Sequence, residues 1–177
     1  WGTMPSDAEE VGWYRAARDR LVAALAAAPP NLACWTFLPN SPDPRTFWAR
    51  RQAHELAIHR VDAQRVAGPV EPVSVDFALD GIDELLFGFF GRPRSRLRTP
   101  TPCTLSVRTA EASWLVHIGL EGARAERRDA PGDCTVQGGA SEVYYALWNR
   151  SPLRALHVGG DPAVLDLWTG QAQVRWS

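Results

Sequence analysis

Apolar residues recur at roughly helical spacing in the first part of the chain, between clear start and stop signals. The first such run extends from Val11 to Leu25, and Pro29 ends it because proline cannot continue a helix. Ser6-Asp7-Ala8-Glu9 has the form of a capping box, in which the serine hydroxyl accepts from the glutamate backbone and the glutamate reaches back. We therefore expect a first helix over about residues 7–28.

Two further helices are expected before residue 91. Asp43-Pro44 offers an N-cap followed by proline at the first helical position, and Gly68-Pro69 offers a stop, so a long helix should lie between them. Residues 74–90 carry a third apolar run of helical period. The long helix has an apolar stripe of Phe47, Ala53, Leu56, Ala57, Ile58 and Val61, and a polar stripe of Arg51, Gln52, Glu55, His59 and Asp62.

The second half of the chain changes to a period of two. Residues 92–102 include prolines and arginines without a clear period, which is typical of a linker. Alternation at Leu105 and Val107, and again from Trp114 to Ile118, predicts a hairpin. Weaker strand and helix patterns continue to Trp168. The expected fold class is α+β, with a helical domain over 1–91 and a small α+β domain over 103–177.

Composition excludes several classes of protein. The 19 basic residues are all arginine and are balanced by 20 acidic residues, so no large positive field favours nucleic acid as a partner. No apolar run in the sequence is long enough to span a membrane, and no basic region followed by an apolar segment marks a secretory signal. Three cysteines without a CxxC pair speak against a disulfide framework and against a thiolate zinc site. We expect a protein of the reducing cytoplasm.

Glu55 and His59 are the residues with the clearest chemical meaning. Residues four apart on a helix project from one face with Cβ atoms about 5–6 Å apart, so these two side chains can converge on one ion. Zinc takes such oxygen and nitrogen ligands, but two ligands do not make a site. The spacing alone equally fits a solvated helix pair or a hydrogen-bonded histidine.

The sequence around this pair is more specific than the spacing. Residues 47–63 read FWARRQAHELAIHRVDA, which resembles the HE-x-x-x-HR-x-DA segment of the mycothiol-dependent maleylpyruvate isomerase family. Residues 76–86 resemble the third segment of the DinB-like helical bundle of that family. Residues 103–168 resemble its sterol-carrier-like C-terminal domain. The resemblance implies that Glu55 and His59 bind a divalent metal, usually zinc.

In this family the remaining metal ligand is a histidine from an earlier helix, and no histidine precedes His54 here. We expect a preceding helix that supplies the ligand and completes a four-helix bundle, the other possibility being that this member has lost it. His54 projects about 100° away from Glu55 and should anchor packing instead. Asp62 is expected either to orient His59 or to pair with Arg65.

The resemblance also implies a catalytic role for Arg150, which follows the helix expected over 140–149. The family usually has glycine before this arginine, whereas this chain has Asn149. A simpler role is also open, since a cation at a helix C-terminus complements the helix dipole. His117 and His157 lie in expected strands and should be structural, and the three cysteines are expected to be ordinary buried thiols.

The function implied by the resemblance is that of a metal-dependent enzyme. It would use mycothiol, a low-molecular-weight thiol, for transfer to a small electrophilic substrate or for its isomerisation, with the metal lowering the pKa of the thiol. The identity of the substrate is open. The alternative is a non-catalytic protein with a degenerate metal site, whose sterol-carrier-like domain binds an apolar ligand or a partner protein.

Overall fold

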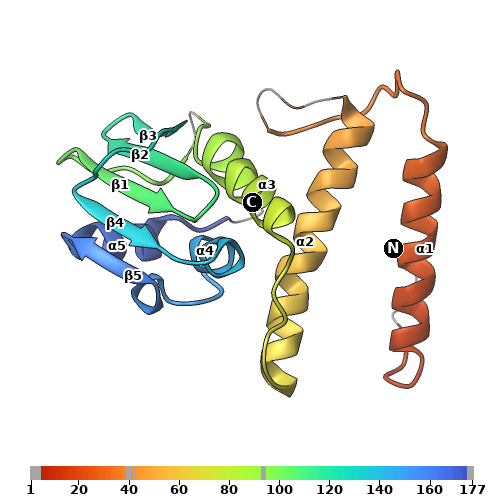
Figure 1. The fold of residues 1–177 in the computed structure, drawn as a ribbon. Coiled ribbons are helices and arrows are strands. Elements are labelled where there is room, and N and C mark those ends of the chain that lie inside the picture. The colour runs from red at the N-terminus through yellow and green to blue at the C-terminus, as the bar shows by residue number, and fades with distance from the viewer. Residues whose placement is uncertain (1–4, 39–40, 42, 93–94, 175–177) are drawn as a thin grey trace. The chain divides into compact units, whose positions relative to one another are not determined.

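The computed structural model describes residues 5–38, 41, 43–92 and 95–174. The chain forms two compact units, and the division falls inside one helix, between Ala53 and His54. Unit 1 comprises residues 1–37 and 41–53, and unit 2 comprises 38–40 and 54–177. In chain order the elements are α1 Glu10–Ala27, α2 Pro44–Ala67, α3 Val75–Asp83, the π-helix η1 Glu84–Phe89, β1 Cys103–Arg108, β2 Ser113–Gly119, β3 Gly122–Arg127, β4 Cys134–Gln137, α4 Ala140–Leu147, the 3₁₀-helix η2 Leu153–Ala155, β5 His157–Gly160 and α5 Ala163–Gln171 (Figure 1).

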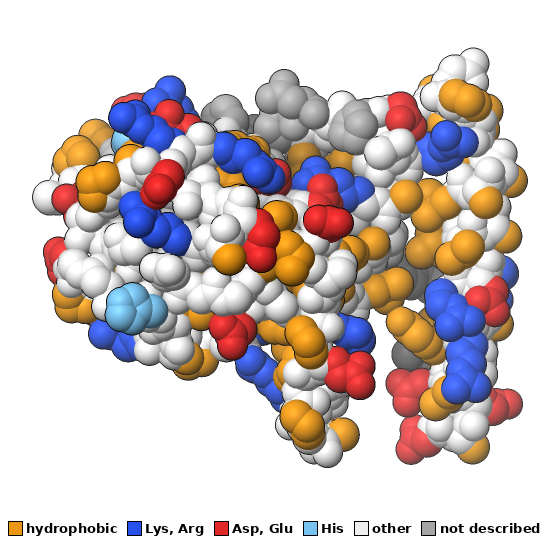
Figure 2. All heavy atoms as spheres, viewed as in Figure 1, with side chains coloured by type: hydrophobic (Ala, Val, Ile, Leu, Met, Phe, Trp, Pro, Cys, Tyr) orange, Lys and Arg blue, Asp and Glu red, His pale blue; other side chains and the backbone are white. Residues whose placement is uncertain are grey.

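Unit 1 contains α1 and the start of α2. Glu9 accepts hydrogen bonds from the backbone N–H and the hydroxyl of Ser6, at 3.2 and 2.6 Å. The other half of the expected capping box is missing, because the Glu9 N–H donates to the backbone carbonyl of Ser6 and not to its hydroxyl. Residues 7–9 therefore form a turn, and α1 begins at Glu10. No residue of α1 is buried, and hydrophobic side chains stand exposed along it (Figure 2).

An aromatic cluster connects the loop after α1 to the first turns of α2. The rings of Phe37 and Phe47 meet edge to face with centroids 5.1 Å apart, and the Trp48 indole N–H donates to the Trp35 carbonyl at 2.9 Å. The predicted cap is present, since Asp43 accepts from the Thr46 backbone N–H at 3.0 Å. Hydrogen bonds from the side chain and the backbone N–H of Thr46 hold the pKa of Asp43 below its usual range. The helix therefore starts where Asp43-Pro44 indicated.

Unit 2 is built on a five-stranded sheet of order β3-β2-β1-β4-β5. β1 pairs parallel to β4 and antiparallel to β2, and the other pairings are antiparallel. The predicted hairpin is confirmed, with Leu105 opposite Val116 and both side chains buried. Trp114 lies on the same face of β2 as Val116, and its indole N–H donates to Asp83 of α3 at 2.8 Å. A helical N-terminal part followed by a mixed sheet with its own helices confirms the predicted α+β class.

The third predicted helix ends in a form that the sequence did not indicate. It runs without a break from α3 into η1, where the Phe90 N–H bonds to the Leu85 carbonyl five residues earlier. Such i to i+5 bonding usually reflects tertiary packing and often occurs near functional sites. Nearly all of η1 is buried in unit 2. The helix therefore belongs with the sheet, and the expected domain boundary at residue 91 does not coincide with the compact units.

His54 holds the second part of α2 against α3 and α4. Its Nε2 lies 2.7 Å from an Asp80 carboxylate oxygen, and its Nδ1 lies 3.1 Å from the Tyr144 hydroxyl. Its ring packs at a tilt against Phe77, with the ring centroids 4.4 Å apart. The expected apolar stripe was therefore partly wrong. Leu56 is exposed, whereas the polar His54 is buried because both of its ring nitrogens find partners. No helix in the described ranges is both long and apolar enough to cross a membrane.

Gly81 provides a test of this packing, because a Cβ there would overlap the Tyr144 ring and lie 2.9 Å from the His54 ring. We expect Gly81→Ala to lower the free energy of unfolding by about 1–3 kcal/mol, as overpacking of a core does. Gly170→Ala is the matched control, since a Cβ there meets nothing within 4 Å and alanine favours the helix. Urea unfolding followed by circular dichroism measures both. Equal stability of the two variants would contradict the proposed packing role of Gly81.

Candidate functional site

An open cleft of about 470 Å³ lies beside the second part of α2 in unit 2. Its walls come from α2, η1, the end of α4 and the segment after α5. Apolar and polar residues are mixed, so the cleft can accommodate a ligand with both characters. The lining residues are Glu55, Ile58, His59, Leu85, Leu147, Trp148, Asn149, Arg150, Thr169, Ala172, Gln173 and Val174.

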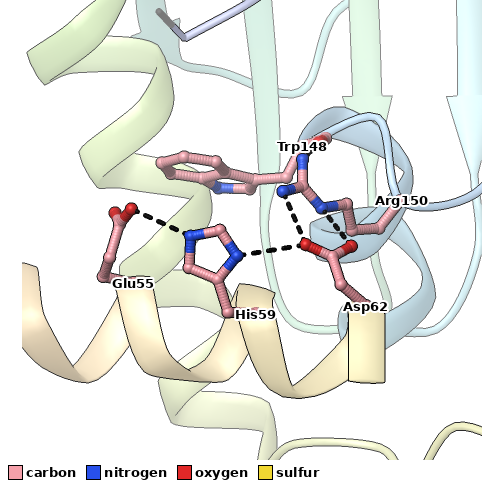
Figure 3. Close-up of polar contacts among 5 residues, drawn as sticks. All are labelled: Glu55, His59, Asp62, Trp148 and Arg150. Carbon is pink, nitrogen blue, oxygen red and sulfur yellow. Dashed lines mark hydrogen bonds and ion pairs between the residues drawn. The ribbon is translucent and has the colours of Figure 1, made fainter. Parts of the chain in front are cut away.

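Three polar residues of α2 follow one another along the edge of this cleft (Figure 3). His59 Nε2 lies 3.3 Å from Glu55 Oε1, and His59 Nδ1 lies 3.1 Å from Asp62 Oδ2. The side chains of Glu55, His59 and Asp62 are 27%, 61% and 44% exposed, and a ligand in the cleft can reach Glu55 and His59, which line it. The structure thus brings together the pair that the sequence singled out.

The imidazole of His59 is placed between two carboxylates. A neutral imidazole carries one proton, so it can donate to only one of them, and its other nitrogen then presents a lone pair to a carboxylate oxygen. A cation at the second nitrogen would make both contacts favourable.

Arg150 reaches the same place from the turn after α4. Asn149 adopts a left-handed backbone with φ of 58°, and the Arg150 N–H closes the turn by donating to the Tyr145 carbonyl at 2.8 Å. The guanidinium binds Asp62 side-on, from Nε at 2.9 Å and Nη2 at 3.0 Å, and Nη1 donates to the Trp148 carbonyl at 3.0 Å. Within the described chain these contacts use three of the five guanidinium N–H groups, and the other two can bind an anionic group.

Comparison with known proteins identifies the family. The model of the mycothiol maleylpyruvate isomerase N-terminal domain matches residues 2–64, and that of the MDMPI C-terminal domain matches residues 76–167. The chain belongs to the mycothiol maleylpyruvate isomerase family. Among the matching solved structures, one titled "UbiJ-SCP2 Ubiquinone synthesis protein" has 22% sequence identity and a TM-score of 0.38, with 58% of this chain and 93% of that chain covered. No curated protein matches the chain.

Asn149 departs from the glycine expected in this family, and its backbone explains the difference. A left-handed residue after a helix is usually glycine and sometimes asparagine, because asparagine tolerates this conformation. The asparagine side chain also donates to the Ala172 carbonyl at 2.6 Å. The substitution thus preserves the turn that carries Arg150. That arginine does follow a helix C-terminus, as the simpler role required, but its guanidinium is directed to Asp62.

In the described ranges no group of three or more His, Cys, Asp and Glu side chains is placed to hold a metal ion, so a complete triad of the family type is not found there. Asp62 cannot complete the set on the Glu55 side, because it faces the opposite nitrogen of the His59 ring. The cleft leaves space beside Glu55 and His59.

The remaining candidate residues lie outside the cleft. His117 pairs with Glu126 at 3.1 Å on the sheet, and His157 is exposed on β5. Cys134 is buried as expected and Cys103 is partly buried, and burial raises the pKa of both thiols, with Asp161 acting in the same direction. The expectation was wrong for Cys34, which is exposed in the loop after α1.

Sequence reasoning missed the cleft walls and the partner of Asp62. Trp148 is almost fully buried, and its indole lies beside the Glu55 and His59 pair (Figure 3). Asp62 pairs with Arg150, not with the nearby Arg65. The available signal for Trp148 was its position directly before the Asn149-Arg150 turn. For the Asp62 contact there was none, since the two residues are 88 positions apart.

The pKa of Asp62 reports this ion pair. Burial alone would raise it, but the hydrogen bonds and the charge of Arg150, with a smaller contribution from His59, hold it below its usual range. A lowered pKa in the folded state means that the carboxylate stabilises the fold above its unfolded pKa, and that this contribution is lost as the pH falls through the folded value. Because the side chain is 44% exposed, we expect less than about 1 kcal/mol from the pair.

We expect Arg150→Gln to raise the pKa of Asp62, since burial remains while the main stabilising charge is lost. A carboxyl ¹³C NMR titration measures the change. Arg154→Gln is the matched control, because Arg154 pairs with Asp166 outside the cleft. An Asp62 pKa that is the same in wild type and Arg150→Gln would show that the ion pair is absent in solution.

Proposed function

We propose that the protein is a metal-dependent enzyme that uses mycothiol as a thiol cosubstrate for transfer to, or isomerisation of, a small electrophile. The observation that carries the proposal is the separation of 3.3 Å between His59 Nε2 and Glu55 Oε1. Membership in the mycothiol maleylpyruvate isomerase family supports the thiol and the reaction class. The three free cysteines of the chain fit a reducing compartment such as the cytoplasm.

The separation of the two ligand atoms supports a shared zinc ion. Zinc binds histidine nitrogen at about 2.0–2.1 Å and carboxylate oxygen at about 2.0–2.2 Å, so tetrahedral geometry places two such ligands about 3.3–3.5 Å apart. The atoms of His59 and Glu55 already have this separation. When bound, a divalent metal lowers the pKa of a thiol and polarises an electrophilic oxygen.

The residues around the pair have distinct tasks in this proposal. Glu55 and His59 hold the cation, and Trp148 with Leu85 and Leu147 forms an apolar wall that limits access of water. Arg150 offers its remaining N–H groups to an anionic part of the substrate or to negative charge that develops in the reaction. Addition of the thiolate forms an S–C bond while the C=C π pair of the electrophile moves onto its conjugated carbonyl oxygen. After rotation about the resulting single bond, that pair re-forms the double bond and the C–S bond breaks, which releases the thiolate and the isomer.

The alternative of an apolar-ligand carrier receives less support from unit 2. Its interior between sheet and helices is filled by fully buried aromatic side chains, among them Trp114, Tyr144 and Trp168. An interior ligand would have to displace these rings, at a cost comparable to that of losing a core residue. The cleft at α2 is the site that presents reactive groups, and the enzyme is the function that uses them.

We expect the full-length protein to bind about one zinc ion per chain, as three-ligand catalytic sites do. His59→Ala should weaken zinc by more than the roughly 10–100-fold typical of losing an outer partner of a ligand. Calorimetric titration of metal-free protein with zinc measures the affinity. His117→Ala is the matched control, because His117 forms a similar histidine–glutamate contact at 3.1 Å elsewhere. Zinc affinity that survives His59→Ala unchanged would refute the ligand assignment.

We expect consumption of small α,β-unsaturated electrophiles to depend on added mycothiol and not on glutathione at the same concentration. His59→Ala should lower kcat/KM by at least about 10²-fold, since a metal contributes several kcal/mol to such a reaction. A spectrophotometric assay over a panel of electrophiles measures both effects. A panel with no mycothiol-dependent turnover, in protein that binds zinc, would favour the non-catalytic alternative.

A further inference from the structure

We propose that Asn149 is a positioning residue that fixes one wall of the cleft and thereby limits the size of the electrophile that the cleft accepts. This wall is the segment after α5, residues 172–174, which lines the cleft together with the turn at Asn149 and Arg150. The observation is the hydrogen bond from the Asn149 side-chain amide to the Ala172 carbonyl, at 2.6 Å. The part concerning the electrophile rests on the proposed function, whereas the part concerning the wall is a property of the folded chain alone.

The Ala172 carbonyl lies where a helix runs out of its own donors. The last carbonyls of a helix have no N–H partner four residues later, so the buried ones are satisfied by a group from elsewhere. α5 ends at Gln171, and the Ala172 N–H closes its last turn by donating to the Trp168 carbonyl at 2.7 Å. Ala172 is only 2% exposed. Asn149, 23 residues earlier in the chain, therefore caps the C-terminus of α5.

Asparagine at position 149 combines two properties that this contact requires. The residue has a φ of 58° at the end of α4, where its N–H donates to the Ala146 carbonyl at 3.0 Å. Besides glycine, asparagine and aspartate are the residues that adopt this left-handed conformation. Glycine has no side-chain donor, and an ionised aspartate only accepts hydrogen bonds. Asparagine is therefore the residue that allows the turn and also supplies the donor.

Two other hydrogen bonds hold α5 before the segment begins. The Trp168 indole N–H donates to the Leu147 carbonyl at 3.2 Å, and the Gln171 side chain accepts from the Arg98 backbone N–H at 2.9 Å. The Asn149 contact acts one residue beyond Gln171. Its loss should therefore loosen the segment after α5 while the helix itself stays in place.

A loosened segment changes which ligands the cleft accepts. The cleft volume of about 470 Å³ is in the lower half of the range of about 300–1,000 Å³ for small-molecule sites. On the α4 side the wall is rigid, because Trp148 is 7% exposed and its indole N–H donates to the Gly81 carbonyl at 3.3 Å. A bulky electrophile therefore has to displace the segment after α5, and Asn149 sets the resistance to that displacement. A small electrophile fits without it.

Hydrogen exchange in full-length, metal-free protein tests the wall. In Asn149→Gly and Asn149→Asp, the amides of residues 172–174 should exchange about 2–10-fold faster than in wild type, the factor that corresponds to one net hydrogen bond. Asn31→Gly is the matched control, because this exposed asparagine lies in the loop after α1 and should change nothing. Unchanged exchange in Asn149→Gly would overturn the anchoring role, and so would wild-type exchange in Asn149→Asp, which lacks the donor. An equal acceleration in the β1–β2 hairpin would also overturn it, since the effect would then be global.

Substrate selectivity tests the second part in the same proteins. With mycothiol and α,β-unsaturated electrophiles of increasing size, the ratio of kcat/KM for the bulkiest to that for the smallest should rise about 10-fold in Asn149→Gly. The rise should come from a lower KM for the bulky electrophile. An unchanged ratio alongside faster exchange would overturn the specificity role and leave the anchoring. Absence of mycothiol-dependent turnover in wild type would overturn the proposed function and the selectivity with it, whereas the exchange result still decides the wall.

Discussion

The burial of His54 sets the rotation of α2, and the candidate site depends on that rotation. His54, Ile58 and Val61 are the buried side chains of the second part of the helix, at the spacing i, i+4, i+7. Glu55, His59 and Asp62 follow the same spacing one residue later, so they form the adjacent stripe, about 100° around the helix. A stripe beside the buried face lies at the edge of the contact with α3 and α4. This placement is why Glu55 and His59 line the cleft and all three polar residues are partly exposed.

The elements predicted from the sequence were those with strong local signals. Asp43-Pro44 and the alternation in β1 and β2 located α2 and the hairpin, because caps, proline and the period of two act within a few residues. The pair Glu55 and His59 could be predicted from the sequence for the same reason, since its geometry is set by one helical turn. The π-helix η1 and the position of the unit boundary were not, because both depend on which distant surfaces pack together.

The long-range part of the site could not be obtained from spacing. His54 was expected to pack, but hydropathy gives no indication that Asp80 and Tyr144 receive its two nitrogens. The link from Asp62 to Arg150 joins segments 88 residues apart, and local charge pattern suggested Arg65 instead. A buried histidine with two partners and a bidentate arginine are tertiary features. A sequence motif can identify such residues, but only the structure gives their contacts.

The electrostatic balance of the site follows from these contacts. Glu55 and Asp62 contribute two negative charges and Arg150 one positive charge, so with a neutral His59 the group carries one net negative charge. Because Arg150 is held on Asp62, its charge compensates that carboxylate. The left-handed turn at Asn149, fixed by its hydrogen bond to Ala172, is what holds the arginine beside Asp62.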